Sequence, residues 1–145
     1  MLVTRMAVLS LLGFLAACAA AANGANPHSA PREGLVPSLQ VNTSGNTVHF
    51  TLQISNTGST PVPLEFTSGQ SFDFAVLQAG REVWRWSADQ MFTQALRSET
   101  LAPGATRSYE ATWSPPAGMR GELTASGVLT ASNRRVEQRA IFRLP

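Results

Sequence analysis

The sequence predicts an all-β protein, an immunoglobulin-like antiparallel β-sandwich of seven to eight strands with one short helix. From about residue 35 onward, apolar and polar residues alternate in short runs, and Gly, Pro, Asn and Ser separate these runs. Charged residues make up only 14% of the chain, whereas 14 Ser and 13 Thr supply side chains that suit exposed sheet faces. A length of 145 residues fits one domain.

The first strands are indicated by alternation and by turn residues. Residues 47–54 are the clearest run, with one apolar and one polar face, and His49 belongs to the polar face. The run that contains Leu39 and Val41 precedes it across a Ser-Gly-Asn turn. Residues 61–66 alternate as well, but they include two prolines, which the middle of a sheet does not tolerate, so this run is expected at an edge.

Later strands are expected at residues 72–76, 81–86, 109–113, 122–131 and 136–144. The alternation breaks between residues 86 and 103, where Ser87 and Gln90 have the spacing of a helix capping box. This spacing predicts a short helix over residues 89–96 that plugs one end of the sandwich. Its expected buried face consists of Met91, Phe92, Ala95 and Leu96.

The amino-terminal residues predict export and membrane anchoring. Residues 1–17 carry one positive charge and then a short apolar run, which is typical of a signal peptide rather than a membrane span. Leu15-Ala16-Ala17-Cys18 resembles the lipobox of bacterial lipoproteins, which implies cleavage before Cys18 and acylation of this only cysteine. The alternative is an ordinary signal peptide with an incidental cysteine. Residues 18–36 are expected to be a tether and residues 37–145 the folded domain.

This anchor places the domain outside the cytoplasm, at the bacterial cell envelope. Several acyl chains on one residue give stable membrane attachment. Because Ala19, and not Asp, follows the cysteine, the resemblance to lipoprotein sorting signals implies the outer membrane in a cell that has one.

The residue inventory argues against catalysis and against cofactors. Beyond the predicted tether the only histidine is His49, on a polar strand face with no acid next to it, so a Ser, Thr or Cys nucleophile lacks a base. One histidine without a thiol is insufficient for zinc, and the two aspartates form no calcium loop. No glycine-rich loop opens a helix, and a net charge of +2 does not suit nucleic acid. We expect no enzyme, metal, cofactor or small-molecule substrate.

A distinctive motif occupies the middle of the chain. It reads Ser-Gly-Gln-x-Phe-Asp-Phe at residues 68–74, Val-Trp-Arg-Trp-Ser at 83–87 and Phe-x-Gln at 92–94. An Asn-x-Gly turn at residues 56–58 precedes it, and Pro103-Gly104 and Trp113 follow. This pattern resembles the BsuPI family, named for an intracellular proteinase inhibitor, and the resemblance spans roughly residues 39–144. It implies an immunoglobulin-like sandwich and a protease as partner.

The motif is interpreted first as fold specification and second as a binding epitope. Gly69 is expected to give a turn its φ freedom, and Gln70 and Asp73 to bond turn amides. Asp73 and Arg85 are candidates for a partly buried ion pair, the alternative being two solvated side chains. Four aromatic side chains of the motif are expected to pack as a core against the short helix. Phe74 is a further motif residue, and Ser87 belongs to the helix cap. The four aromatics are Phe72, Trp84, Trp86 and Phe92.

Two functions are compatible with these observations. The first is a proteinase inhibitor of the envelope that acts by protein binding, with residues 114–121 as the candidate loop. Pro115 and Pro116 restrict the loop, and Met119 or Arg120 would enter the specificity pocket of a subtilisin-like or trypsin-like serine protease. The loop's structural alternative is a plain connection between strands. The second function is a non-inhibitory interaction module that binds another envelope protein.

Overall fold

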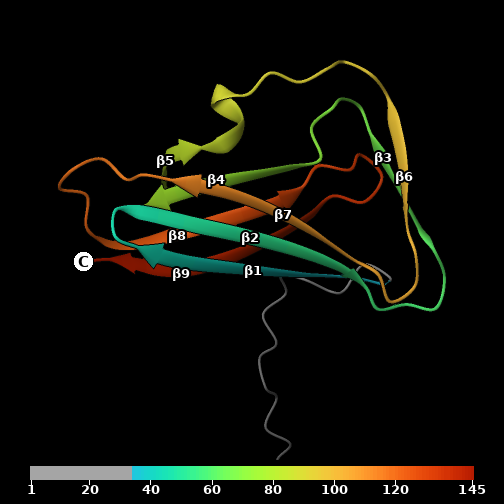
Figure 1. Cartoon of the computed structure of the whole chain (residues 1–145), viewed down its shortest axis with the longest axis horizontal. Helices are drawn as coiled ribbons and strands as arrows, with labels where there is room; N and C mark the ends of the chain where they lie inside the picture. The colour runs from blue at the N-terminus through green and yellow to red at the C-terminus, as the bar shows by residue number, and fades with distance from the viewer. Residues whose placement is uncertain (1–33) are drawn as a thin grey trace, which may run out of the picture.

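The computed structural model describes residues 34–145, and this part of the chain is built from β-strands (Figure 1). The elements in chain order are β1 Leu35–Ser44, β2 Thr47–Asn56, β3 Val62–Phe66, β4 Phe72–Gln78, β5 Arg81–Arg85, the 3-10 helix η1 Trp86–Asp89, β6 Arg97–Leu101, β7 Thr106–Trp113, β8 Gly121–Leu129 and β9 Val136–Leu144. Strand β1 begins two residues before the expected domain start at position 37. Within residues 34–145 no helix has the length and apolarity needed to cross a bilayer.

The predictions of a signal peptide and of a lipid site at Cys18 lie outside the described residues. The expected tether also falls there, apart from its last three positions.

The strands form two main sheets and one short ribbon, and every pairing is antiparallel. The sheets have the orders β1-β2-β7 and β5-β4-β8-β9, and β3 pairs with β6 at one end of the molecule (Figure 1). Strands β9, β8, β4 and β5 occupy the positions of strands G, F, C and C′ of an immunoglobulin domain. Strands β1, β2 and β7 occupy the positions of strands A, B and E. The predicted immunoglobulin-like β-sandwich is confirmed.

The core lies between the two main sheets, and strand β2 shows how alternation builds it. Its four apolar side chains are at most 1% exposed, whereas His49 between them is exposed as expected. The Phe50 ring lies 5.5 Å from the Trp84 ring and 5.7 Å from the Phe74 ring, measured between centroids. Phe50 therefore joins the first sheet to β4 and β5 of the second. The four buried side chains are Val48, Phe50, Leu52 and Ile54.

The proline-containing run forms β3, which pairs only with β6. Pro63 therefore sits in a two-stranded ribbon and not in the middle of a sheet, as expected. Its neighbours Val62, Leu64 and Phe66 are buried under this ribbon.

The predicted helix over residues 89–96 is wrong. The helical turn is η1, which ends at Asp89, and residues 90–96 have no helical structure. The capping box does not form because the Ser87 hydroxyl donates to the Asp73 carboxylate (2.7 Å) instead of capping a helix. The expected buried face is also wrong: Phe92 is half-buried, but Met91, Ala95 and Leu96 are exposed.

Strand β6 accounts for a second difference. The described residues contain nine strands, not seven or eight, because Arg97–Leu101 pairs with β3. The sequence of Arg97–Leu101 shows no alternation of apolar residues, since Leu101 at its end is the only apolar residue. The pairing partner, more than the pattern of the segment itself, makes it a strand.

Tyr109 on β7 has a buried hydroxyl that makes no hydrogen bond within residues 34–145. Replacing Tyr109 with Phe is expected to raise the free energy of unfolding by roughly 1 kcal/mol at neutral pH, because an unpaired buried hydroxyl is removed while the ring still stacks on Phe72 at 5.0 Å. Chemical denaturation of both proteins measures this difference.

Tyr109→Phe is also expected to change how the free energy of unfolding depends on pH. Burial, with the negative charge of Glu99, raises the pKa of Tyr109 above its ordinary value of 10.0, so the folded state holds this proton more tightly than the unfolded state. The resulting stability is fully present below the unfolded pKa and is lost as pH rises through the folded pKa. Tyr109→Phe should therefore flatten the alkaline decline. Equal declines in the two proteins would contradict this assignment.

Candidate functional site

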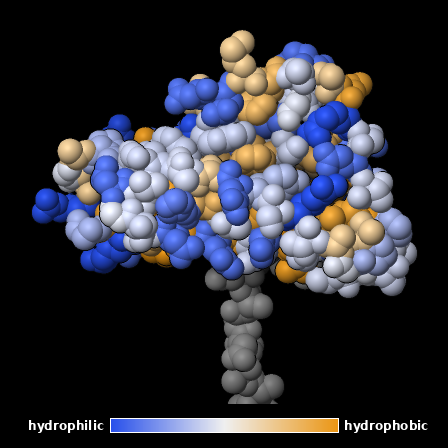
Figure 2. Space-filling model, in the orientation of Figure 1, coloured by the Kyte–Doolittle hydropathy of each residue, from blue (hydrophilic) through white to orange (hydrophobic). Residues whose placement is uncertain are grey.

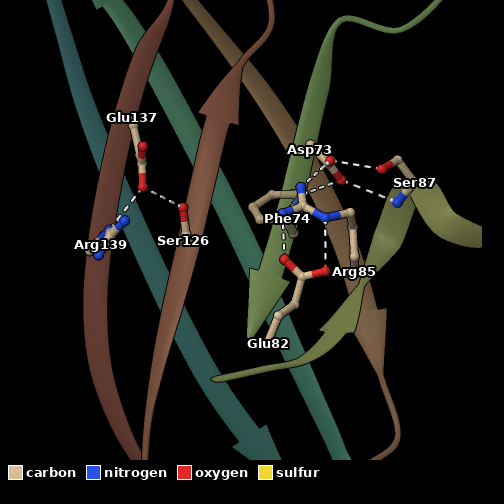
Figure 3. Close-up of polar contacts among 8 residues, drawn as sticks. All are labelled: Asp73, Phe74, Glu82, Arg85, Ser87, Ser126, Glu137 and Arg139. Carbon is tan, nitrogen blue, oxygen red and sulfur yellow. Dashed lines mark hydrogen bonds and ion pairs between the residues drawn. The ribbon is translucent and has the colours of Figure 1, made fainter. Parts of the chain in front are cut away.

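Asp73 on β4 is a buried carboxylate at the centre of a polar network (Figure 3). One of its oxygens, Oδ1, accepts hydrogen bonds from the backbone N–H groups of Phe74 (2.9 Å) and Ser87 (3.1 Å). The other, Oδ2, accepts from the Ser87 hydroxyl (2.7 Å) and from Nη1 of Arg85 (2.7 Å). The expectation that Asp73 bonds turn amides is met only in part, because the two backbone amides belong to β4 and η1 and not to a turn between strands. The network holds the start of η1 against β4, an inner strand of the β5-β4-β8-β9 sheet.

Arg85 on β5 completes the network on its exposed side. Its Nε and Nη2 atoms donate to the two carboxylate oxygens of Glu82, at 3.0 and 2.5 Å, in a bidentate pair. The predicted ion pair with Asp73 is confirmed, with 41% of the Arg85 side chain and 9% of the Asp73 side chain exposed. Hydrogen bonds to Glu82 and then to Asp73 raise the pKa of Arg85 above its usual range.

A second polar group lies on the same face of this sheet, on β8 and β9 (Figure 3). Glu137 accepts hydrogen bonds from Nε of Arg139 (2.8 Å) and from the Ser126 hydroxyl (2.9 Å), and these bonds lower its pKa. A small cavity of about 190 Å³ separates the two groups. Among residues 34–145, no three His, Cys, Asp or Glu side chains are grouped so as to bind a metal ion. Because the carboxylates of Asp73 and Glu137 are already paired, we assign these groups a structural role.

Gly69 lies directly against residues 90–96, which we call the 90–96 segment. Its N–H donates to the carbonyl oxygen of Thr93 (2.8 Å), and a Cβ atom at Gly69 would lie 2.8 Å from the Thr93 hydroxyl and 3.3 Å from the Thr93 nitrogen. The expected φ freedom is wrong, because Gly69 does not have a positive φ. Glycine is needed because of this close approach.

Arg97 fastens the far end of the 90–96 segment. It donates to the carbonyl oxygen of Ser68 (3.3 Å) and to the hydroxyl of Ser71 (2.7 Å), and its guanidinium lies 4.5 Å from the Phe66 ring centroid. The turn at residues 67–71 is closed from within, because the Gln70 side-chain amide donates to the carbonyl oxygen of Phe72 (3.1 Å). The expectation that Gln70 bonds a turn amide is therefore wrong, because its side chain bonds the carbonyl of Phe72, the first residue of β4.

Aromatic side chains pack against the 90–96 segment through Phe92. The Trp86 ring of η1 stacks on Phe72 at 4.3 Å, and Phe92 in the segment packs on Trp86 at 5.8 Å. Trp84 stacks on Trp113 at 5.8 Å. The aromatic packing of Phe72, Trp86 and Phe92 is confirmed, but residues 90–96 form no helix for the cluster to pack against.

The 90–96 segment itself is exposed and hydrophobic. Met91 is 100% exposed and Leu96 is 82% exposed. Hydrophobic side chains stand out on the surface where the chain runs from η1 to β6 (Figure 2). A cavity of about 530 Å³, lined by Trp86, Asp89 and Glu110 among others, opens beside the start of the segment. Sequence reasoning missed this surface because it assigned the two side chains to a buried helix face.

The loop at residues 114–121 is less open than expected. Pro115 is buried, and Met119 is half-buried and packs against the hydrophobic core. The N–H of Met119 donates to the carbonyl oxygen of Pro116 (3.1 Å), and the Gln78 side-chain amide donates to the carbonyl oxygen of Arg120 (2.9 Å). Of the two residues predicted to enter a protease pocket, only Arg120 is exposed. It does not lie next to the motif residues in sequence or in the pairing scheme.

A family model described as BsuPI, intracellular proteinase inhibitor, matches residues 35–134, which is most of the described fold. The chain belongs to the BsuPI family. The match ends before β9, although β9 pairs with β8 over its whole length and completes the second sheet.

Solved structures similar to this BsuPI chain include the sporulation control protein Spo0M from Bacillus subtilis, at 13% identity and a TM-score of 0.45. That match covers 77% of this chain and 48% of Spo0M, so the chain spans about half of that protein. A β-glucosidase from Erythrobacter marinus, EmGH1, matches at 12% identity and a TM-score of 0.32, over 72% of this chain and 15% of the enzyme. A search of curated proteins found no match.

The motif residues that carry the BsuPI resemblance converge on one place in the fold. Asp73 and Ser87 hold the start of η1, Gly69 approaches the middle of the 90–96 segment, and Trp86 supports Phe92. The motif residues therefore act structurally, and together they fix the position of the 90–96 segment.

Proposed function

We propose that the chain is a non-catalytic proteinase inhibitor that is held at the bacterial cell envelope by lipid on Cys18. The observation that carries the inhibitory function is the BsuPI match over residues 35–134. The fold supports it, because an inhibitor needs a rigid scaffold that loses little conformational freedom on binding. The lipobox-like residues before Cys18 support the anchor.

Titration of the full chain, purified in detergent, against subtilisin and trypsin tests the inhibitory function. We expect stoichiometric loss of activity of at least one of these serine proteases, measured with a peptide substrate. Rapid digestion of the chain, or unchanged activity of both proteases, would contradict inhibition and would leave the alternative of an interaction module for another envelope protein. Incorporation of labelled palmitate in cells tests the anchor, and an unlabelled chain would contradict it.

The titration also tests the loop at residues 114–121. If this loop binds the protease, Arg120→Ala weakens inhibition of trypsin, whereas Met119→Ala acts mainly through stability because Met119 packs against the core. Unchanged potency of Arg120→Ala would remove the loop from consideration.

A further inference from the structure

The two most exposed of the large apolar side chains in residues 34–145 lie in one stretch of seven residues. They are Met91 and Leu96, at 100% and 82% exposure, and the next is Ile141 on β9 at 70%. Burying such side chains in a partner removes apolar surface from water, which is the main favourable contribution to most protein association. Together the two make the 90–96 segment the most concentrated source of apolar binding energy on the described surface.

The segment begins in an extended conformation and is held at its start, at its middle and just after its end. Gln90, where it starts, has φ −108° and ψ 150°, which are extended values, and Asp73 holds the preceding helical turn through Ser87. Thr93 is bonded to Gly69, and the chain after the segment is held by Arg97. A segment fixed in its bound form loses little entropy when it binds, and this favours high affinity.

The backbone beside Met91 is available to a partner. No hydrogen bond within residues 34–145 involves the backbone groups of Met91 or Phe92, and Phe92 is held by its packing on Trp86. An extended backbone with free donors and acceptors can pair with another chain as an added strand. Proteases bind substrates in this way, with one side chain in a specificity pocket.

We infer that the 90–96 segment is the surface through which this chain inhibits a protease, and that Met91 enters the specificity pocket. This inference rests on the proposed inhibitory function. Because Met91 is uncharged, unbranched and flexible, the pocket that fits it is deep and apolar. The partner is therefore a serine protease with an apolar specificity pocket, of the subtilisin or chymotrypsin type, and not a trypsin-like enzyme whose pocket carries an aspartate.

Inhibition constants of the full chain and of three variants for subtilisin and trypsin test this inference. Met91→Glu should weaken inhibition of subtilisin by about 100-fold or more, since the side chain that fills the pocket becomes charged. Met91→Arg should weaken inhibition of subtilisin and create inhibition of trypsin. Ile141→Glu, an equally drastic change on the edge strand farthest from β5, is the matched control and should leave both constants within about threefold.

The possible outcomes separate the two proposals. If the unaltered chain inhibits subtilisin and both Met91 variants retain its potency, the assignment of the 90–96 segment as the inhibitory surface is wrong, and the proposed inhibitory function stands. The assignment is also wrong if the unaltered chain inhibits trypsin more strongly than subtilisin, a result that would point to Arg120 as the residue in the specificity pocket. If the chain inhibits neither protease, the inhibitory function fails, and this inference fails with it. Because Met91 is fully exposed, its variants should melt at the temperature of the unaltered chain, and this confirms that they are folded.

Discussion

Replacing Asp73 with Ala is expected to lower the free energy of unfolding by about 3 to 5 kcal/mol. The substitution leaves Nη1 of Arg85 and both the N–H and the hydroxyl of Ser87 without their acceptor. The hydrogen bond to the N–H of Phe74 is lost as well. Urea denaturation followed by tryptophan fluorescence measures the loss, because Trp86 follows Arg85 directly in the chain.

Asp89→Ala is the matched control. Asp89 is an exposed aspartate of the same helical turn that makes no hydrogen bond or ion pair within residues 34–145. Its replacement should change the free energy of unfolding by less than about 0.5 kcal/mol. A loss below about 1 kcal/mol for Asp73→Ala would show that the network contributes little to stability.

The Asp73 variant also connects stability to binding. Since Asp73 holds Ser87 and thereby η1, its loss should speed hydrogen exchange around Gln90, whose N–H donates to the carbonyl oxygen of Ser87 (3.2 Å). If the 90–96 segment binds the protease, inhibition should weaken in the same variant without any change at Met91. Asp89→Ala should affect neither measurement.

Much of the fold was predictable because strand alternation is a local property. The β1–β2 hairpin follows from two alternating runs around Gly45, which has φ 58° in the turn. The edge position of the proline-containing strand follows from the missing N–H of Pro63. In each case the signal and the structure concern the same few residues.

The candidate surface was not predictable in this way because a distant residue decides it. Ser87 and Gln90 have the spacing of a helix cap, but Asp73, 14 positions before Ser87, takes both the hydroxyl and the N–H of Ser87. Thr93 is likewise bonded to Gly69 in another part of the chain. The signal that was present is the motif itself, whose first and second parts supply the partners for the third.

Asn56, where β2 ends, shows a related limit of sequence reasoning. The Asn-x-Gly pattern indicates a turn, and the N–H of Gly58 does donate to the Asn56 side-chain oxygen (3.0 Å). However, Asn56 is only 1% exposed, and its side-chain nitrogen donates to the carbonyl oxygens of Thr60 (2.8 Å) and Leu101 (2.9 Å). One amide therefore joins β2 to the β3–β6 ribbon, which a turn pattern alone does not indicate.

Replacing Asn56 with Asp tests this joint with almost no change of shape. At neutral pH the introduced carboxylate would place a negatively charged oxygen against the carbonyl oxygens of Thr60 and Leu101, so two buried hydrogen bonds become repulsive contacts. We expect a loss of about 3 to 5 kcal/mol in the free energy of unfolding. The control Asn46→Asp, at an exposed turn position, should change it by less than about 0.5 kcal/mol.

The pH dependence of the Asn56 variant distinguishes charge from shape. Burial against two carbonyl oxygens should raise the pKa of the introduced carboxyl in the folded state above its unfolded value of about 4. The stability gained from holding that proton is then present below the unfolded pKa and is lost as pH rises through the folded pKa. Measured against the unaltered chain, the deficit should therefore shrink as the solution is acidified from pH 7 toward about pH 4. A deficit that stays constant over this range would mean that the lost donor bonds, and not the buried charge, destabilise the joint between the sandwich and the ribbon.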